Sequence, residues 1–168
     1  MLRLEVIEVE LEDGTRSQRE IIRHPGAVAV LAHTAKGQCL LVRQYRKAVE
    51  EEMEEVIAGT LDPGEDPEAC ARREVEEETG HRVGRIERLG VIYPSPGYLD
   101  EKITVFRADV SPCMDPASAD LDERVEAVTR DEQEIESAIA SGAIRDAKTL
   151  AAWSLHRLIP PGKQSGQP

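Results

Sequence analysis

Cysteine is scarce in this sequence, with only Cys39, Cys70 and Cys113 among 168 residues. An odd number argues against a disulfide framework, and no two of the three have the spacing of a metal-binding or redox pair. We therefore interpret these cysteines as small buried hydrophobic residues.

Long apolar runs are also missing. The longest, such as residues 27–32 (AVAVLA), are far too short to cross a lipid bilayer. The N-terminal stretch MLRLEVIEVELEDG lacks the basic start and the apolar block of a signal peptide. We therefore expect a cytoplasmic protein without a membrane partner.

Positive charge is outweighed, because 21 Lys and Arg residues stand against 33 Asp and Glu residues, for a net charge of −12. Nucleic-acid binding needs a basic surface that displaces counterions, so we expect no nucleic-acid partner. A phosphate-bearing small molecule remains compatible with this balance, because carboxylates can recruit divalent cations that in turn hold phosphates.

The pattern of apolar and polar residues predicts one domain over residues 1–160 and a disordered tail at 161–168. Residues 50–55 form an acidic run, and loops are expected at 59–64 and 111–124. The expected strands are residues 2–11, 17–23, 27–32, 38–44, 86–93, 102–110 and 125–129, and the expected helices are residues 67–79, 132–141 and 147–159. This order is typical of an α/β fold with a mixed sheet sandwiched between helices and an N-terminal antiparallel strand pair within residues 1–24.

The central helix, PEACARREVEEETG, has clear ends: Asp66 suits the N-cap, Pro67 the first helical position and Gly80 the left-handed residue after the last turn. At roughly 100° per residue, Glu77 and Glu78 lie about 60° and 40° to either side of Glu74.

These three glutamates therefore share one face, whereas Glu76 points away. Like charges three and four residues apart repel, and divalent cations with oxygen ligands would compensate. The alternative is a solvated acidic face, which is common for a glutamate-rich helix.

The spacing of further residues around the three glutamates, over positions 59–80, argues against that alternative. The sequence resembles the signature of the Nudix family, which is Gly, five residues, Glu, seven residues, then Arg-Glu-apolar-x-Glu-Glu-x-Gly. The matching positions are Gly59, Glu65, Arg73, Glu74, Val75, Glu77, Glu78 and Gly80. From average residue usage, the probability of a chance match at one start point is on the order of one in a billion. The high glutamate content of this sequence raises that probability by roughly thirtyfold, which still leaves it negligible. The apolar residue that follows the last glycine in the family is His81 here, and Val83 could take over its packing.

The resemblance implies a Nudix fold in which Glu74, Glu77 and Glu78 bind the catalytic magnesium ions, for which manganese is a possible substitute. It implies that the backbone carbonyl of Ala58 joins them. Arg73 would orient the glutamates, and Glu65 would support the loop and the helix. Metals of this kind neutralise a diphosphate and lower the pKa of an attacking water.

Other segments are similar to the ADP-ribose pyrophosphatase branch of the family. They are LVRQYR (41–46), EEVIAG (54–59), Ser95-Pro96-Gly97 before Asp100-Glu101-Lys102, and SGAIRDAKTLAAW (141–153). Pro96 lies fifteen residues after His81, the marker spacing of that branch. The implied reaction converts ADP-ribose and water into AMP and ribose 5-phosphate.

Two rival functions stay open. One is a Nudix enzyme for another substrate, such as a GDP-sugar, a dinucleotide polyphosphate or a damaged nucleotide. The other is a ligand sensor that catalyses no reaction, and the intact glutamate triad argues against it.

Relatives often stack adenine on an N-terminal aromatic residue, but residues 1–24 contain none. Apolar contacts or Arg23 would have to replace it.

Several substrate contacts are implied residue by residue. Arg46 is a candidate clamp on a phosphate, and the alternative is a surface arginine at a strand end. Glu55 either joins the substrate or metal network or is plain surface within the acidic run. Pro96 and Gly97 would shape the loop, and Glu101 would contact the terminal ribose.

The catalytic base is expected from the loop at 111–124, which contains Asp120-Leu121-Asp122-Glu123. Glu123 matches an acid that binds metal when this loop closes. Leu121 stands where some relatives carry the base, so Asp120, Asp122, Glu123 or Glu77 would act instead.

The N-terminal strands in residues 1–24 cross to a second subunit in this branch, which predicts a homodimer. The alternative is a small lid sheet within one monomer.

Ile57 stands where relatives usually have proline, which affects the stiffness of the loop at the entrance to the signature.

Overall fold

Strand β3 (Ala27–Thr34) lies at the centre of a mixed sheet in the computed structural model, which describes residues 2–113 and 125–162. The sheet runs in the order β5-β4-β3-β8-β7, with β6 beside β3 and β9 beside β4. The bounds of these strands are β4 Cys39–Arg46, β5 Glu51–Glu55, β6 Ile57–Thr60, β7 His81–Ile92, β8 Ile103–Pro112 and β9 Glu126–Arg130. Only β3 and β8 pair in parallel among these described strands.

One edge of β3 is divided between two partners. Its first half, Ala27 to Val30, pairs with β6, and its second half pairs with β4 at Ala32 and His33. The division brings β6 to the start of β3. The signature glycine, Gly59, therefore lies within the sheet, directly opposite Val28.

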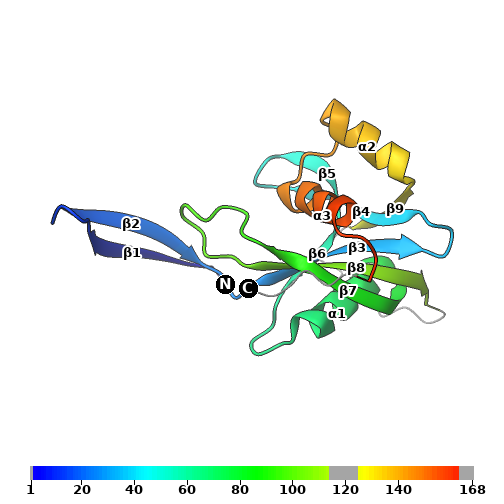
Figure 1. Cartoon of the computed structure of the whole chain (residues 1–168), viewed down its shortest axis with the longest axis horizontal. Coiled ribbons are helices and arrows are strands. Elements are labelled where there is room, and N and C mark those ends of the chain that lie inside the picture. The colour runs from blue at the N-terminus through cyan, green and yellow to red at the C-terminus, as the bar shows by residue number, and fades with distance from the viewer. Residues whose placement is uncertain (1, 114–124, 163–168) are drawn as a thin grey trace.

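Helices cover both faces of the sheet, as predicted (Figure 1). Val28 and Val30 of β3 pack with Cys70 and Val75 of α1 (Pro67–Thr79). The alternate residues Ala29 and Leu31 face the other core, which contains Ile135 of α2 (Glu132–Ser141) and Trp153 of α3 (Ala147–Leu158). A strand whose two sets of side chains are both buried reads as a continuous apolar run, which explains the sequence AVAVLA.

Helix α1 begins and ends where the sequence predicts. The Asp66 carboxylate accepts hydrogen bonds from the backbone N–H groups of Glu68 and Ala69, at 2.9 and 3.2 Å. Gly80 adopts the left-handed conformation at φ 65° and donates its N–H to the Glu76 carbonyl. The expected packing role of Val83 is also confirmed, because it is buried on the α1 side of the sheet.

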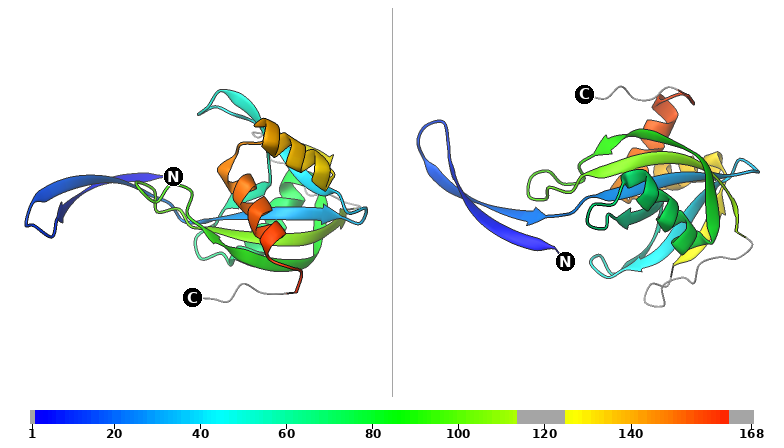
Figure 2. Two further views of the ribbon diagram at one scale, coloured as in Figure 1. Left: turned by 45° about the horizontal axis from the view of Figure 1, so that its top comes forward. Right: turned by 90° about the horizontal axis from the view of Figure 1, so that it is seen from below.

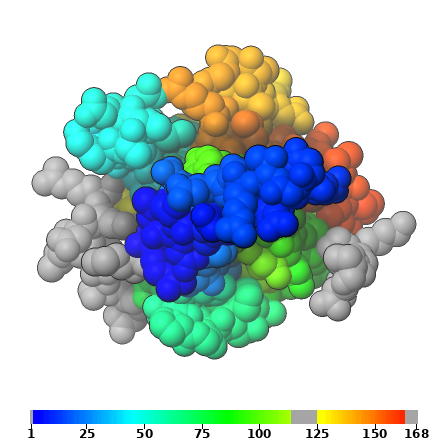
Figure 3. All heavy atoms as spheres, turned by 90° about the vertical axis from the view of Figure 1, so that its left-hand side faces the viewer, coloured from blue at the N-terminus to red at the C-terminus, as the bar shows by residue number. Residues whose placement is uncertain are grey.

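The N-terminal strands β1 (Arg3–Glu10) and β2 (Arg16–Arg23) form an antiparallel hairpin of their own. The hairpin projects from one end of the body in every ribbon view (Figure 2). Viewed from that end, it stands in front of the rest of the molecule (Figure 3). It is linked to the body by the chain that leads into β3, by a short parallel bridge between Ile22 and Leu99, and by an ion pair between Arg23 and Asp100.

The sequence did not predict β5 and β6. Residues 51–55 read as an acidic run, yet they pair with β4 from Val42 to Arg46. Residues 57–60 lead into an expected loop, yet they pair with β3. Both strands are short and take their stability from the neighbours that they pair with. No helix among the described residues is long and apolar enough to span a membrane.

Candidate active site

A cavity of about 550 Å³ opens where β3 and β8 begin. Its lining comes from the starts of both strands, from β4 and β6, from α1, and from the first turn of α3. Of the candidate residues from the sequence, the lining includes Arg46, Ala58, Arg73, Glu74, Glu78 and Glu101. A second cavity, of about 660 Å³, lies at the far end of β3 and contains none of these residues.

Arg73 holds the signature glutamates together. Its Nη1 donates to Glu74 Oε1 at 2.7 Å and to Glu77 Oε2 at 2.9 Å. Its Nε and Nη2 donate to the two oxygens of Glu65, both at 3.0 Å. Glu65 in turn accepts the backbone N–H of Asp62 at 2.9 Å, so a single guanidinium ties α1 to the loop that precedes it.

The carboxylates in this network differ in how easily they ionise. The hydrogen bonds from Arg73 and from the Asp62 backbone lower the pKa of Glu65 to about 2. Burial raises the pKa of Glu74, and the neighbouring Arg73 only partly offsets this. The ionised Glu74 carboxylate therefore gains from a further positive charge in the cavity.

Gly59 makes room for Glu74. A Cβ atom at position 59 would overlap the Glu74 carboxyl group, so only glycine lets this side chain lie against β6. Glu74 and Glu78 enter the cavity beside Ala58, while Glu77 contacts Arg73 at the edge. Carboxylate and carbonyl oxygens are the ligands that magnesium prefers, so these residues fit a site for such a cation.

The opposite wall is built around Glu55, whose side chain is only 1% exposed. Arg46 donates from Nε and Nη2 to its two oxygens, at 2.8 and 2.7 Å, and Lys148 contacts it as well. Burial opposes ionisation of Glu55, but these cations prevail and lower its pKa. Lys148 also donates to Asp146, the N-cap of α3, at 3.0 Å.

Other candidates lie around the cavity. Pro96 and Gly97 form an exposed turn and do not line it. Glu101 lines it and lies 3.6 Å from the His24 ring. Arg23, one alternative for holding adenine, donates instead to Glu5 and Asp100. Four residues of the proposed base region lie outside the described residues: Asp120, Leu121, Asp122 and Glu123.

The sequence did not single out Lys148, Asp146 or Gln44, all of which line the cavity. The first two lie within the C-terminal stretch that resembles the ADP-ribose pyrophosphatase branch, but nothing in its pattern separates them from their neighbours. Lys148 depends on its contact with Glu55 of β5, 93 residues away in the chain, and Asp146 accepts from Lys148. The plain-surface alternative for Glu55 is wrong, because Glu55 is buried.

Comparison with known proteins identifies the family. The NUDIX domain family matches residues 23–153. The chain is 42% identical over 150 residues to ADP-ribose pyrophosphatase of Bacillus subtilis (strain 168), which covers 89% of this chain and 81% of that protein. It is 42% identical over 153 residues to the methanol dehydrogenase activator of Bacillus methanolicus, which covers 90% and 83%.

Less similar proteins also match over most of the chain. GDP-mannose pyrophosphatase of Escherichia coli (strain K12) is 34% identical over 154 residues, covering 82% of this chain and 80% of that protein. The crystal structure of an ADP compounds hydrolase matches with a TM-score of 0.81 at 22% identity, covering 94% of this chain and 85% of that chain. At that identity the match shows the fold. The family match spans most of the chain, and the signature residues meet at one cavity, so this protein belongs to the Nudix family of hydrolases.

Proposed function

We propose that this enzyme hydrolyses the diphosphate bond of ADP-ribose, giving AMP and ribose 5-phosphate, with magnesium as its cofactor and manganese as a possible substitute. The observation that carries the proposal is the lining of the cavity, in which carboxylates of α1 and the cations Arg46 and Lys148 border the same space. A diphosphate suits the space between them, because it can bind cations on both sides. The 42% identity to an ADP-ribose pyrophosphatase supports this choice of substrate.

In this proposal Glu74, Glu77, Glu78 and the Ala58 carbonyl hold the cations. A bound magnesium ion would neutralise the diphosphate, polarise phosphorus and lower the pKa of a water molecule. Arg73 keeps the carboxylates in place when they would otherwise repel one another.

On the other wall, Arg46 and Lys148 neutralise the phosphate oxygens. Glu101 contacts the terminal ribose, and Pro96 and Gly97 shape the loop that carries it. The general base is a residue of the 120–123 segment or Glu77, with Glu123 a further metal ligand. Glu55 positions Arg46 and Lys148 rather than touching the substrate.

A GDP-sugar is the second candidate substrate. The 34% identity to a GDP-mannose pyrophosphatase favours it. The absence of any aromatic residue in positions 1–24 that could stack on adenine leaves the base preference open. Both reactions would use the same cations and the same attack on a diphosphate. They differ only in the groups at the two ends of the substrate.

A panel of nucleoside diphosphate compounds with magnesium tests the proposal, with the products separated by chromatography. We expect ADP-ribose to show the highest kcat/KM and to yield AMP in equal amount with ribose 5-phosphate. Excess chelator should abolish turnover, and added magnesium or manganese should restore it. Faster turnover of GDP-mannose would select the second candidate, and full activity in chelator would overturn the metal mechanism.

We also propose that the hairpin joins two copies of the chain into a homodimer. Its apolar residues Leu4 and Val6 are 64% and 58% exposed, and a two-stranded hairpin is marginally stable alone. Leu4→Glu combined with Val6→Glu should halve the mass measured by light scattering after size exclusion. An unchanged dimer mass would overturn this reading, and a monomeric wild-type protein would favour the lid alternative. The cytoplasmic location stays a prediction.

A further inference from the structure

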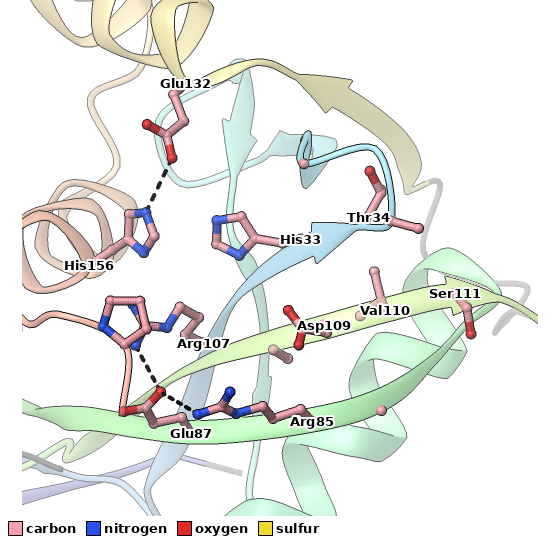
Figure 4. Close-up of a pocket in the computed structure, with 15 residues that line it drawn as sticks. His33, Thr34, Arg85, Glu87, Arg107, Asp109, Val110, Ser111, Glu132 and His156 are labelled. Atoms are coloured by element: carbon pink, nitrogen blue, oxygen red, sulfur yellow. Dashed lines mark hydrogen bonds and ion pairs between the residues drawn. The ribbon is translucent and has the colours of Figure 1, made fainter. Parts of the chain in front are cut away.

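The second cavity, at the far end of β3, contains two histidines and a glutamate that the Nudix reaction does not use. His33 comes from the end of β3, Glu132 from the first turn of α2, and His156 from the last turns of α3. The three side chains converge from three different elements (Figure 4). Five residues separate His33 from Val28 of the active site, which is about 17 Å along a strand.

The three side chains lie at distances that suit a shared ion. One potential ligand atom from each lies within 4.8 Å of the others. His156 Nε2 lies 3.5 Å from Glu132 Oε1, and the two imidazole centroids are 4.9 Å apart. Ligands at about 2.0–2.1 Å from a tetrahedral zinc ion stand about 3.3 Å from one another, so the separation of His156 and Glu132 already suits the ion.

One imidazole offers a buried nitrogen without a partner. His33 Nε2 has no hydrogen-bond partner among the described residues, whereas His156 faces Glu132 through Nε2, so its own unpartnered Nδ1 is not the atom that would bind the ion. Buried polar atoms are almost always paired, so such an atom calls for an explanation. Burial lowers the pKa of both histidines and the nearby Arg107 lowers it further, while Glu132 acts in the opposite direction. Neutral imidazole is the form that binds a metal ion.

The surroundings hold the glutamate in place. Arg157 donates to Glu132 Oε2 at 3.0 Å, which leaves Oε1 directed toward His156. Asp109 lies opposite His33 in the β3–β8 pairing and adds negative charge to the same cavity. The positive charge of Arg107 is largely offset by Glu87, whose Oε2 accepts from Arg107 Nη2 at 2.8 Å.

We propose that His33, His156 and Glu132 form a second metal site, for zinc or a similar divalent transition metal, distinct from the magnesium site. Two imidazoles and one carboxylate match the preferences of zinc, whereas magnesium selects oxygen ligands. A water molecule in the cavity completes the tetrahedron. This inference does not depend on the substrate of the Nudix site.

Such an ion would connect three parts of the chain. It would join the end of β3 to α2 and to α3, and α3 begins with the Asp146 and Lys148 that line the active site. Its expected effect is structural. It fixes the C-terminal helices on the sheet and thereby stabilises the folded protein in proportion to its occupancy.

Zinc titration of the full-length protein by isothermal calorimetry, in excess magnesium that saturates the oxygen site, tests the proposal. We expect one zinc ion per chain for the wild type and binding at least about 100-fold weaker for His33→Asn and for His156→Asn. His81→Asn is the matched control, because His81 lies outside this cavity and should bind zinc like the wild type. Zinc at roughly 100 times its Kd should raise the Tm by about 5–11 °C in the wild type and in the control, but not in the other two.

X-ray absorption on the zinc-loaded wild type gives an answer that does not require any variant to fold. Two imidazole ligands per zinc support the proposal. An all-oxygen shell would overturn it, as would wild-type affinity in folded His33→Asn and His156→Asn. Failure to bind any zinc in excess magnesium would also overturn it.

Discussion

The two walls of the active-site cavity differ in how their charges are balanced. On the α1 wall, Arg73 donates to Glu65, Glu74 and Glu77, and Glu78 adds a further carboxylate. On the opposite wall, the two carboxylates of Glu55 and Asp146 are matched by the two cations of Arg46 and Lys148. Among the described residues, the α1 wall therefore has more carboxylates than cations (the incomplete wall), whereas the other wall has equal numbers of both (the balanced wall).

Loss of a carboxylate from the incomplete wall should have the largest effect. We expect Glu77→Gln and Glu78→Gln each to lower kcat by roughly 10³-fold, because a bound metal contributes several kcal/mol to the barrier. Glu76→Gln is the matched control and should stay near the wild-type rate, since it lies away from the other glutamates on α1. Steady-state kinetics with magnesium measures this. Equal losses for all three variants would contradict the assignment of the acidic face.

A methyl group added at position 59, between the sheet and the α1 wall, should have the next largest effect. Gly59→Ala forces the Glu74 carboxyl group away from β6, so we expect kcat/KM to fall by roughly 100-fold and stability by about 1–3 kcal/mol. Gly84→Ala is the control, since its added Cβ would make only an ordinary contact at 3.5 Å. Kinetics and urea unfolding report both quantities. Wild-type activity in Gly59→Ala would show that the position of Glu74 is not critical.

Removing a cation from the balanced wall should act mainly on substrate binding. With Lys148→Met, Glu55 and Asp146 outnumber Arg46, and the wall becomes negative toward a diphosphate. We expect KM to rise about tenfold with a smaller change in kcat. Lys36→Met, in an exposed turn, is the control. If kcat fell and KM did not change, Lys148 would act on the transition state instead.

The smallest expected effect is on the pH dependence of stability. Because Arg73 lowers the pKa of Glu65 to about 2, this pair stabilises the fold above the ordinary pKa of 4.5, and the contribution is lost as the pH falls from there toward 2. In metal-free buffer, Glu65→Gln should therefore be less stable than the wild type at about pH 6, and the gap should narrow at about pH 3. Urea midpoints at both values measure it, and a constant gap would contradict the linkage.

Local signals predicted much of this molecule. Asp66 and Gly80 fix the ends of α1 by short-range geometry, and the spacing of the glutamates places them on one face. The balanced wall could not be predicted in the same way. The sequence left two interpretations of Glu55 open, a member of the site network or plain surface, because its burial depends on Arg46 from a neighbouring strand and on Lys148 from a helix far along the chain. Charged residues become interior residues only when distant partners arrive, and composition does not record those partners.

The bridge between the hairpin and the body has a mechanical consequence. Ile22 of β2 accepts the N–H of Asp100 at 3.1 Å and donates its own N–H to the Tyr98 carbonyl at 2.7 Å. The hairpin is thus hydrogen-bonded directly to the loop that leads to Glu101, on the rim of the cavity. The position of this part of the rim is therefore tied to the position of the hairpin.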